Sequence, residues 1–337
     1  MLLDNLSVKN FSVITPYKIP NLLNKKVNAG DGFIFDSSIK LIGHNPKYVF
    51  SSREPLDEEK INLINSTKLL VITGANILKD NLEILTDFNI NTLKKILVPI
   101  ALMGVGHYGL HQTNRYGFDE DSKKILTEML TRFPLISVRC KGSFKYIDKF
   151  FSEITKNVLN TSCPVIFKLD NIFNHFKKRD TYNQLVTTIT DRLHLKQQLP
   201  ILHLAKNFFN SQNKILALHQ DYENKNLEIY ANDLGYEIFK SSNYKDYIDL
   251  YKKTDLHFGN RVHAHLKCLS MGIPSFCTPF DLRQFYFAES TGLSLVLDDK
   301  HINLKEFNFD SFVLHQSQSK KIMDDFISQI LKVIVDK

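Results

Sequence analysis

The chain has 337 residues, 43% of them hydrophobic, and its 43 lysines and arginines exceed its 36 aspartates and glutamates by a formal net charge of +7. This length predicts two domains, each with its own core, and this composition excludes a disordered chain. No apolar run approaches the roughly 20 residues of a membrane-spanning helix, and the first residues lack the basic region of a secretory signal, so we expect a cytosolic protein.

The positive charge predicts anionic partners. The lysines are dispersed and no aromatic RNA-binding signature accompanies them, so a peripheral contact with the inner face of an anionic membrane is a better interpretation than nucleic-acid binding. The cysteines stand singly, without a C-x-x-C pair, and we interpret them as reduced structural thiols that predict neither a zinc site nor a disulfide framework. They are Cys140, Cys163, Cys268 and Cys277.

The first half of the chain alternates strand and helix patterns. Apolar runs predict strands at 11–15, 69–73, 96–105 and 135–139 and a closing strand at 161–166, and helical spacing predicts helices at 33–42, after Ser122 and at 144–151. The Asp119-Glu-Asp121 run resembles a metal-binding D-x-D pattern, but it directly precedes a helix. We therefore interpret it as cap and helix-dipole residues and predict no metal there.

Two glycine-rich turns in this half carry candidate ligand contacts. In the segment 28–32, Gly30 and its neighbours permit close approach of a ligand to the backbone and Asp31 can cap the following helix, although a plain strand-to-helix turn would use the same residues. In the segment 104–109, backbone amides can face a ligand, with His107 or His111 as a polar tip.

A third candidate contact ends the strand at 135–139. Arg139 is followed by Ser143 and a helix, and a fixed guanidinium beside a helix N-terminus suits an anion. An ion pair that joins sheet and helix is the alternative interpretation.

The second half repeats the alternation and so predicts a second parallel sheet. Strands are expected at 185–190, 215–219, 237–240, 255–258 and 274–277, and helices at 194–209, 261–271 and 319–335. The charged stretch 168–183 is the best linker candidate. We predict an N-terminal domain over 1–175, a C-terminal domain over 176–318 and a last helix over 319–337 that could dock across both.

The segment 254–279 carries the strongest candidate site of the chain. It predicts a short buried strand broken by Gly259, a helix for which Asn260 is a cap, and a second strand that begins at Pro274. The helix opens with Arg261, His263 and His265, so charged donors gather at a positive helix end, which is a place to hold a phosphate or carboxylate. Solvation of a helix end by these side chains is the alternative.

The run Gly-Asn-Arg-Val-His-Ala-His-Leu at 259–266, followed by Met-Gly-Ile-Pro, resembles the Arg-x-His-Ala signature of the polysaccharide pyruvyl transferase family. The resemblance extends to an Asn-x-Gly-Asp pattern at 28–31, a Ser-x-Arg-x-x-x-Ser pattern at 137–143 and a Cys-Pro segment at 163–164. The family's glycine cluster after the strand at 69–73 is reduced to Gly74. The resemblance implies an α/β fold of two Rossmann-like domains, whose parallel sheets face each other across a cleft (GT-B-like).

The resemblance also implies an enzyme that moves a pyruvyl group from phosphoenolpyruvate onto two hydroxyls of a surface glycan or its precursor, with no metal and no cofactor beside that donor. Arg139, Arg261, Ser143 and Asn260 are the expected donor-binding residues. His263 is the expected acid or base, because its pKa lies near working pH, and His265 is the reserve. Asn28, Asp31, His107 and His111 are the candidate acceptor contacts.

Two other functions remain open at this stage. A nucleotide-sugar glycosyltransferase on the same scaffold would also use an arginine at a helix start, with Asp221 or Glu223 available for a ribose. A non-catalytic glycan-binding relative would keep the scaffold and lose turnover. The acceptor sugar, its linkage and the oligomeric state leave no pattern in the sequence.

Overall fold

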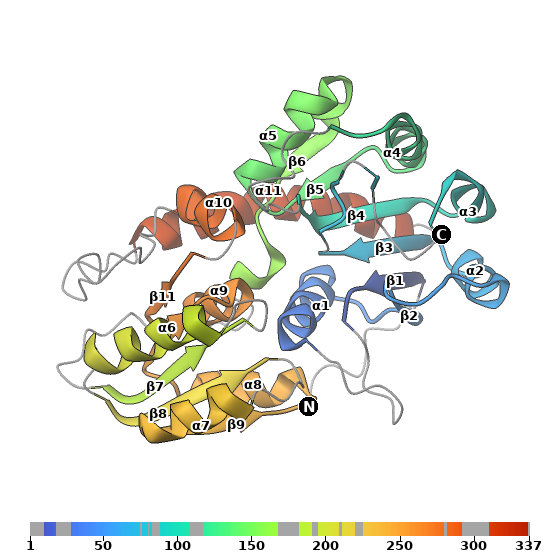
Figure 1. Ribbon diagram of the computed structural model, residues 1–337. Coiled ribbons are helices and arrows are strands. Elements are labelled where there is room, and N and C mark those ends of the chain that lie inside the picture. Colours follow the sequence, from blue (N-terminus) through green and yellow to red (C-terminus); the bar gives the residue numbers. More distant parts are fainter. Residues whose placement is uncertain are drawn as a thin grey trace. The chain divides into compact units, whose positions relative to one another are not determined.

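A computed structural model of the chain (Figure 1) describes residues 10–17, 28–74, 76–79, 81–82, 88–107, 117–167, 182–190, 195–208, 211–219, 225–279, 282–291 and 310–335. The contacts group into two compact units. Unit 1 comprises Met1–Tyr17, Ile34–Leu169 and Leu314–Lys337, and unit 2 comprises Lys18–Phe33 and Asp170–Val313.

This grouping differs from the predicted boundaries at both ends of the chain. The first turn of α1 belongs to unit 2 because Ala29 donates its backbone N–H to the His219 carbonyl at 3.0 Å and the Phe33 ring lies edge-on to that histidine at 5.6 Å. The last helix from Leu314 onward belongs to unit 1, where Phe326 packs edge-on against Phe133 at 5.8 Å.

Unit 1 is built on a six-stranded sheet with the order β2-β1-β3-β4-β5-β6, and every pairing in it is parallel. The strands are β1 (Phe11–Thr15), β2 (Tyr48–Ser51), β3 (Leu69–Thr73), β4 (Ile100–Val105), β5 (Ile136–Val138) and β6 (Val158–Asn160). All residues of β1, β3 and β4 are buried, which is the pattern of a parallel sheet covered on both faces.

The helices of unit 1 are α1 (Ala29–Ile42, with its first turn in unit 2), α2 (Glu58–Asn65), α3 (Ile90–Lys95), α4 (Glu120–Arg132), α5 (Lys141–Phe150) and, from Leu314 onward, α11 (Asp310–Val335). Asp119 caps α4 by accepting the Ser122 N–H at 2.7 Å, and Asp57 caps α2 in the same way through Lys60. The cap interpretation of the Asp119 run is therefore confirmed. Among the described residues no cluster of three or more metal-ligating side chains occurs.

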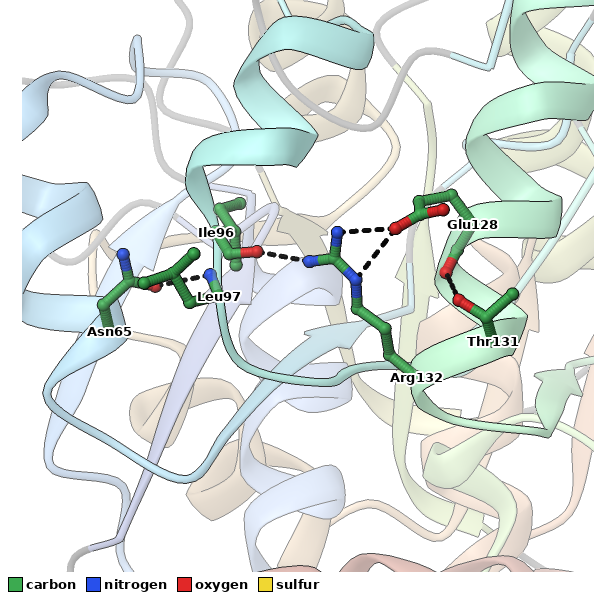
Figure 2. A network of polar contacts seen from close by, with 6 residues as sticks. All are labelled: Asn65, Ile96, Leu97, Glu128, Thr131 and Arg132. Atoms are coloured by element: carbon green, nitrogen blue, oxygen red, sulfur yellow. Dashed lines mark hydrogen bonds and ion pairs between the residues drawn. The ribbon is translucent and has the colours of Figure 1, made fainter.

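A polar network joins the connections beside α2, α3 and α4 in unit 1 (Figure 2). The Arg132 guanidinium donates to the Ile96 carbonyl and to Glu128, with its Nη2 2.7 Å from Oε1. Asn65 accepts the Leu97 N–H at 2.8 Å. These contacts satisfy backbone groups of the segment that leads into β4, which would otherwise lack partners.

Unit 2 is built on a five-stranded parallel sheet with the order β11-β10-β7-β8-β9. Its strands are β7 (Tyr182–Thr188), β8 (Ser211–Leu218), β9 (Tyr236–Lys240), β10 (Leu256–Gly259) and β11 (Ser275–Cys277), and its helices are α6 (Leu195–Phe208), α7 (Lys225–Asp233), α8 (Tyr244–Lys252), α9 (Val262–Ser270) and α10 (Leu282–Thr291). Two parallel sheets with alternating helices confirm the predicted α/β class.

Four local predictions were wrong. The strand expected at 96–105 begins only at Ile100, because α3 precedes it and Pro99 cannot donate to the ladder. The closing strand of unit 1 is β6, and 161–166 instead contains a short 3-10 helix at Pro164–Ile166. Helix α1 begins at Ala29, so Asp31 lies in its first turn and Asn28 precedes it, accepting the Gly30 N–H at 3.1 Å.

The fourth concerns α11, which begins at Asp310 rather than 319. The expected linker at 168–183 lies almost wholly outside the described residues. No helix within the described ranges is long and apolar enough to cross a membrane.

Candidate functional site

The turn between β10 and α9 requires a glycine. Gly259 has φ +154°, and a β-carbon there would stand 2.0 Å from the Thr188 carbonyl oxygen. This close approach lets the Asn260 N–H donate to the same carbonyl at 3.0 Å. The turn therefore brings the start of α9 against the carboxyl end of β7, where parallel sheets place ligand-binding residues.

Asn260 and Arg261 are both fixed by the two residues that follow β7. The Asn260 side-chain oxygen accepts the Thr190 N–H at 2.7 Å, and Arg261 Nε donates to the Ile189 carbonyl at 3.2 Å. Gln198, fully buried on α6, holds the same loop by donating to the Thr190 carbonyl at 3.0 Å. The residue at the capping position of α9 is Arg261 and not Asn260, because the Asn260 oxygen is already committed to Thr190.

The buried Asn260 also carries an amide nitrogen, Nδ2, for which the described residues offer no hydrogen-bond acceptor. A buried donor without an acceptor costs about 1–3 kcal/mol. A bound anion at the helix start would supply the missing acceptor.

His263 lies against the first turn of α1. A β-carbon added to Gly30 would stand 3.2 Å from His263 Nδ1 and 3.3 Å from the Asn28 side-chain oxygen. The imidazole is 9% exposed. The sequence segments 28–31 and 261–263 are thus neighbours within unit 2.

The second histidine of α9, His265, is hydrogen-bonded to the sheet of unit 2. His265 Nδ1 lies 2.7 Å from the Ser275 hydroxyl of β11, and His257 Nδ1 of β10 lies 2.6 Å from the same hydroxyl. Burial lowers the pKa of His265 to about 3. Burial, followed by the neighbouring His265, lowers the pKa of His257 well below its usual value, so both imidazoles are neutral at physiological pH.

Another buried histidine, His219, directly follows β8. His219 bonds to the Tyr251 hydroxyl, and its ring meets that of Tyr247 edge-on at 4.8 Å. Burial first, and then the positive charge of Arg261, lowers the pKa of His219 well below its usual value. Sequence reasoning missed His219 and His257 because a single histidine in an apolar strand carries no motif.

In unit 1 the Ser-x-Arg-x-x-x-Ser residues organise neighbouring loops. The fully buried Arg139 guanidinium bonds to the Asn76 side chain and, through Nη2, to the His107 carbonyl at 3.2 Å. Ser143 accepts the His107 N–H at 3.0 Å, and Ser137 accepts the Gly104 N–H at 2.9 Å. The pattern therefore pins the turn that follows β4.

The His107 side chain stacks on Tyr146 of α5, with ring centroids 4.0 Å apart. Burial, and then the Arg139 charge, lowers the pKa of His107 to about 4. His107 is thus a neutral, oriented group and not a solvated loop tip. His111, and the glycosyltransferase candidates Asp221 and Glu223, lie outside the described residues.

The family model described as polysaccharide pyruvyl transferase matches residues 28–280, which is more than half of the 337-residue chain. The chain belongs to this family. The match contains both segments that meet at His263 and the Arg139 pattern, so all three are features of a polysaccharide pyruvyl transferase family member. The comparison with curated proteins gives no match.

Solved structures share the fold at low identity. A putative UDP-N-acetylglucosamine 2-epimerase from Listeria monocytogenes is similar with a TM-score of 0.52 at 10% identity, over 89% of this chain and 85% of the epimerase. MnaA from S. aureus with UDP gives a TM-score of 0.48 at 12% identity (96% and 91% covered), and a variant of the wall teichoic acid polymerase TagF gives 0.45 at 14% identity (98% and 86% covered). The likeness to the epimerase confirms the GT-B-like fold class.

Proposed function

We propose that this family member transfers the pyruvyl group of phosphoenolpyruvate onto two hydroxyls of a surface glycan or its precursor, forming a cyclic ketal. The observation that carries the proposal is the meeting of the two family segments within unit 2, where Gly30 of α1 lies against His263 beside Arg261. An imidazole at a helix start that suits an anion matches the chemistry of this donor, which carries both a carboxylate and a phosphate.

The donor binds at the start of α9 in this proposal. Arg261 Nε is committed to the Ile189 carbonyl, which fixes the plane of the guanidinium. We assign its terminal nitrogens to a carboxylate or phosphate of the donor, because a planar fork matches two oxygens of such a group. The Asn260 amide nitrogen, without an acceptor among the described residues, is the second donor to the anion.

The reaction then takes two protons from the sugar hydroxyls and gives two, one to carbon and one to the leaving phosphate. A proton adds to the methylene carbon of phosphoenolpyruvate and leaves an oxocarbenium-like centre, which one sugar hydroxyl attacks. Phosphate departs, and the second hydroxyl closes the ketal. The two hydroxyl protons balance the one on the new methyl group and the one on the departing hydrogen phosphate. His263 is the proposed acid and base, and the scheme calls for no metal or cofactor.

Within unit 1, we propose Arg139 and Ser143 as further donor contacts and His107 as an acceptor contact. The hydrogen bonds of Arg139 to Asn76 and His107 support a fixed guanidinium, which anion binding favours. In unit 2, Asn28 and Asp31 are the proposed acceptor contacts. The net charge of +7 supports a peripheral contact with an anionic membrane that presents a lipid-linked acceptor.

The second candidate function is nucleotide-sugar-dependent glycosyl transfer. The fold shared with a UDP-N-acetylglucosamine 2-epimerase favours it, because an arginine at a helix start also suits a diphosphate. A glycan-binding protein without turnover is a third, which donor binding without product would indicate.

A thermal-shift experiment separates these functions, because a ligand that binds only the native state raises Tm by mass action. The protein is heated with phosphoenolpyruvate and with UDP, CMP and GDP sugars at matched ionic strength. We expect a shift with phosphoenolpyruvate alone, lost in Arg261→Ala and reduced in Arg261→Lys, which keeps the charge but not the fork. Lys245→Ala removes one exposed charge from the same unit and is expected to keep the shift.

A shift with one nucleotide sugar alone would overturn the pyruvyl transfer proposal and favour the glycosyltransferase. An equal loss of the shift in Lys245→Ala would mean that general charge, and not the Arg261 site, binds the donor.

A further inference from the structure

One hydroxyl group lies between two buried imidazoles in unit 2. Ser275 Oγ is 2.6 Å from His257 Nδ1 and 2.7 Å from His265 Nδ1. On its other side, His257 Nε2 is 2.8 Å from the Thr188 hydroxyl. The four side chains form one hydrogen-bonded series from β7 through β10 and β11 to α9, in the order Thr188, His257, Ser275, His265.

Counting protons limits this series to few arrangements. A serine hydroxyl has one hydrogen to donate, so Ser275 can donate to only one of the two Nδ1 atoms. If both Nδ1 atoms carried protons, both would donate to Ser275, whose own hydrogen would then have no acceptor among the described residues. Since Ser275 is 1% exposed, that arrangement costs about 1–3 kcal/mol. The two Nδ1 atoms therefore do not both carry protons.

Thr188 decides which histidine is which. If His257 carried its proton on Nε2, it would donate to Thr188, and the Thr188 hydrogen would be left without an acceptor among the described residues in a side chain that is 0% exposed. In the opposite direction, Thr188 donates to His257 Nε2, His257 Nδ1 donates to Ser275, and Ser275 donates to His265 Nδ1. Every hydrogen inside the series then has an acceptor, and the last N–H is on His265, which keeps 7% of its surface exposed.

We propose that Ser275 is a positioning residue which, with His257 and Thr188, holds His265 as a neutral imidazole whose proton is on Nε2. His265 is then a fixed hydrogen-bond donor of the Arg261–His265 segment and not a base. Proton transfer falls to His263, whose Nδ1 lies beside Gly30 and outside the series. The proposed tautomer of His265 does not depend on which ligand the site binds. Only its consequence for turnover rests on the proposed function.

The low pKa values of the two buried histidines agree with this arrangement. Burial lowers the pKa of His265 to about 3 and that of His257 well below its usual range, so neither imidazole takes a second proton at physiological pH. A protonated pair would place two positive charges about one serine hydroxyl in a desolvated layer, which is unfavourable.

Long-range nitrogen–proton NMR spectra of the ¹⁵N-labelled full chain test the proposal directly. Such spectra distinguish a protonated ring nitrogen from an unprotonated one, and His257→Gln and His265→Gln assign the two rings. We expect His265 with its proton on Nε2 and His257 with its proton on Nδ1, unchanged between pH 8 and pH 5.5. The reverse pattern, or a doubly protonated ring in this range, would overturn the proposal.

Two variants test whether the series acts as a unit. Thr188→Val removes the far end without touching His265, and we expect the His265 ring to become a mixture of tautomers. Ser275→Ala is expected to do the same, with rescue by Ser275→Thr. The matched control is Ser270→Ala, because Ser270 is a buried serine of α9 whose hydroxyl donates to the Lys267 carbonyl of the same helix at 2.7 Å.

An unchanged His265 tautomer in folded Thr188→Val would overturn the coupling, even if that variant lost stability. Should Ser275→Ala fail to fold, the parent spectrum and Thr188→Val still decide. None of these measurements needs phosphoenolpyruvate or an acceptor, so failure of the proposed function and failure of this inference are distinguishable.

Discussion

Gly30 and His263 lie against each other within unit 2, and a β-carbon added to Gly30 would stand only 3.2 Å from His263 Nδ1. The contact connects the first turn of α1 to the second residue of α9 and unites two segments that are far apart in the chain. It explains in steric terms why a glycine occurs in the Asn-x-Gly-Asp segment here. The imidazole takes the place that a side chain at residue 30 would fill.

Gly30→Ala tests this contact. Alanine favours a helix over glycine by up to about 1 kcal/mol, so the backbone term favours the variant while the new methyl group displaces the imidazole by a few tenths of an ångström. We expect Tm to change little and kcat to fall about tenfold, which is about 1.4 kcal/mol of barrier. Ser37→Ala, a buried small change on the same helix, should leave kcat unaltered. Full kcat in Gly30→Ala would show that His263 has no need of its present position.

The second prediction compares two glycines of unit 2. Both have positive φ, +154° at Gly259 and +81° at Gly235, but only Gly259 is crowded, with the Thr188 carbonyl oxygen 2.0 Å from an added β-carbon. We expect Gly235→Ala to cost about 1–2 kcal/mol from backbone strain alone. Gly259→Ala should cost about 4 kcal/mol or more, because two backbone segments must separate. Urea denaturation of both variants measures the difference, and equal midpoints would contradict the clash.

The sequence was most informative where structure is local. The strand at 69–73 was predicted with the bounds of β3 because a continuous apolar run between polar residues specifies a buried parallel strand. The cap at Asp119 was predicted for a similar reason, since a cap depends on residues three positions apart.

Contacts between distant segments left no pattern to find. The sequence predicted that Arg139 and Ser143 lie at the end of a strand. It did not predict that they hold the turn at His107, because those hydrogen bonds join segments that follow different strands. Nothing in the sequence indicated the role of Ser275, a single serine in a short strand. That role depends on its hydrogen bonds to the histidines of β10 and α9. Asp31 was predicted to be a cap because the helix was expected to begin at residue 33, whereas α1 begins at Ala29 and Asp31 lies in its first turn.

The third prediction concerns pH. Burial lowers the pKa of His265 to about 3 and of His107 to about 4, whereas an unfolded histidine titrates near 6.5. The unfolded chain thus binds protons that the folded one does not, and stability present above pH 6.5 is lost as the pH falls below it. For His265 the loss is about 1.4 kcal/mol at pH 5.5. We expect the urea midpoint to drop clearly between pH 7.5 and 5.5, less so in His265→Gln; a flat profile would contradict the burial of these imidazoles.

The fourth prediction concerns the network of Figure 2. Arg132 satisfies the Ile96 carbonyl and also pairs with Glu128, and its side chain is 22% exposed. Arg132→Ala should cost about 1–2 kcal/mol, because a backbone carbonyl loses its partner. Glu128→Gln removes only the half-exposed charge pair and should cost less than about 1 kcal/mol. Because both residues lie in unit 1, any donor binding at Arg261 should persist in the two variants. Equal destabilisation by both would mean that the ion pair, and not the carbonyl, is what matters.

The last prediction separates binding from chemistry at His263. Two of the proposed donor contacts, Arg261 and Asn260, are held by hydrogen bonds to the loop after β7. His263→Gln should therefore keep the thermal shift with phosphoenolpyruvate and lower kcat by about 10²–10⁴, the usual contribution of a general acid or base. His265→Gln is the matched change two residues away. Since we assign His265 a donor and not a proton-transfer role, its variant should lose less kcat and keep the pH dependence of the rate. A His263→Gln enzyme with full turnover would remove that residue from the mechanism, and a larger loss in His265→Gln would transfer the acid–base role to the ring that Ser275 holds.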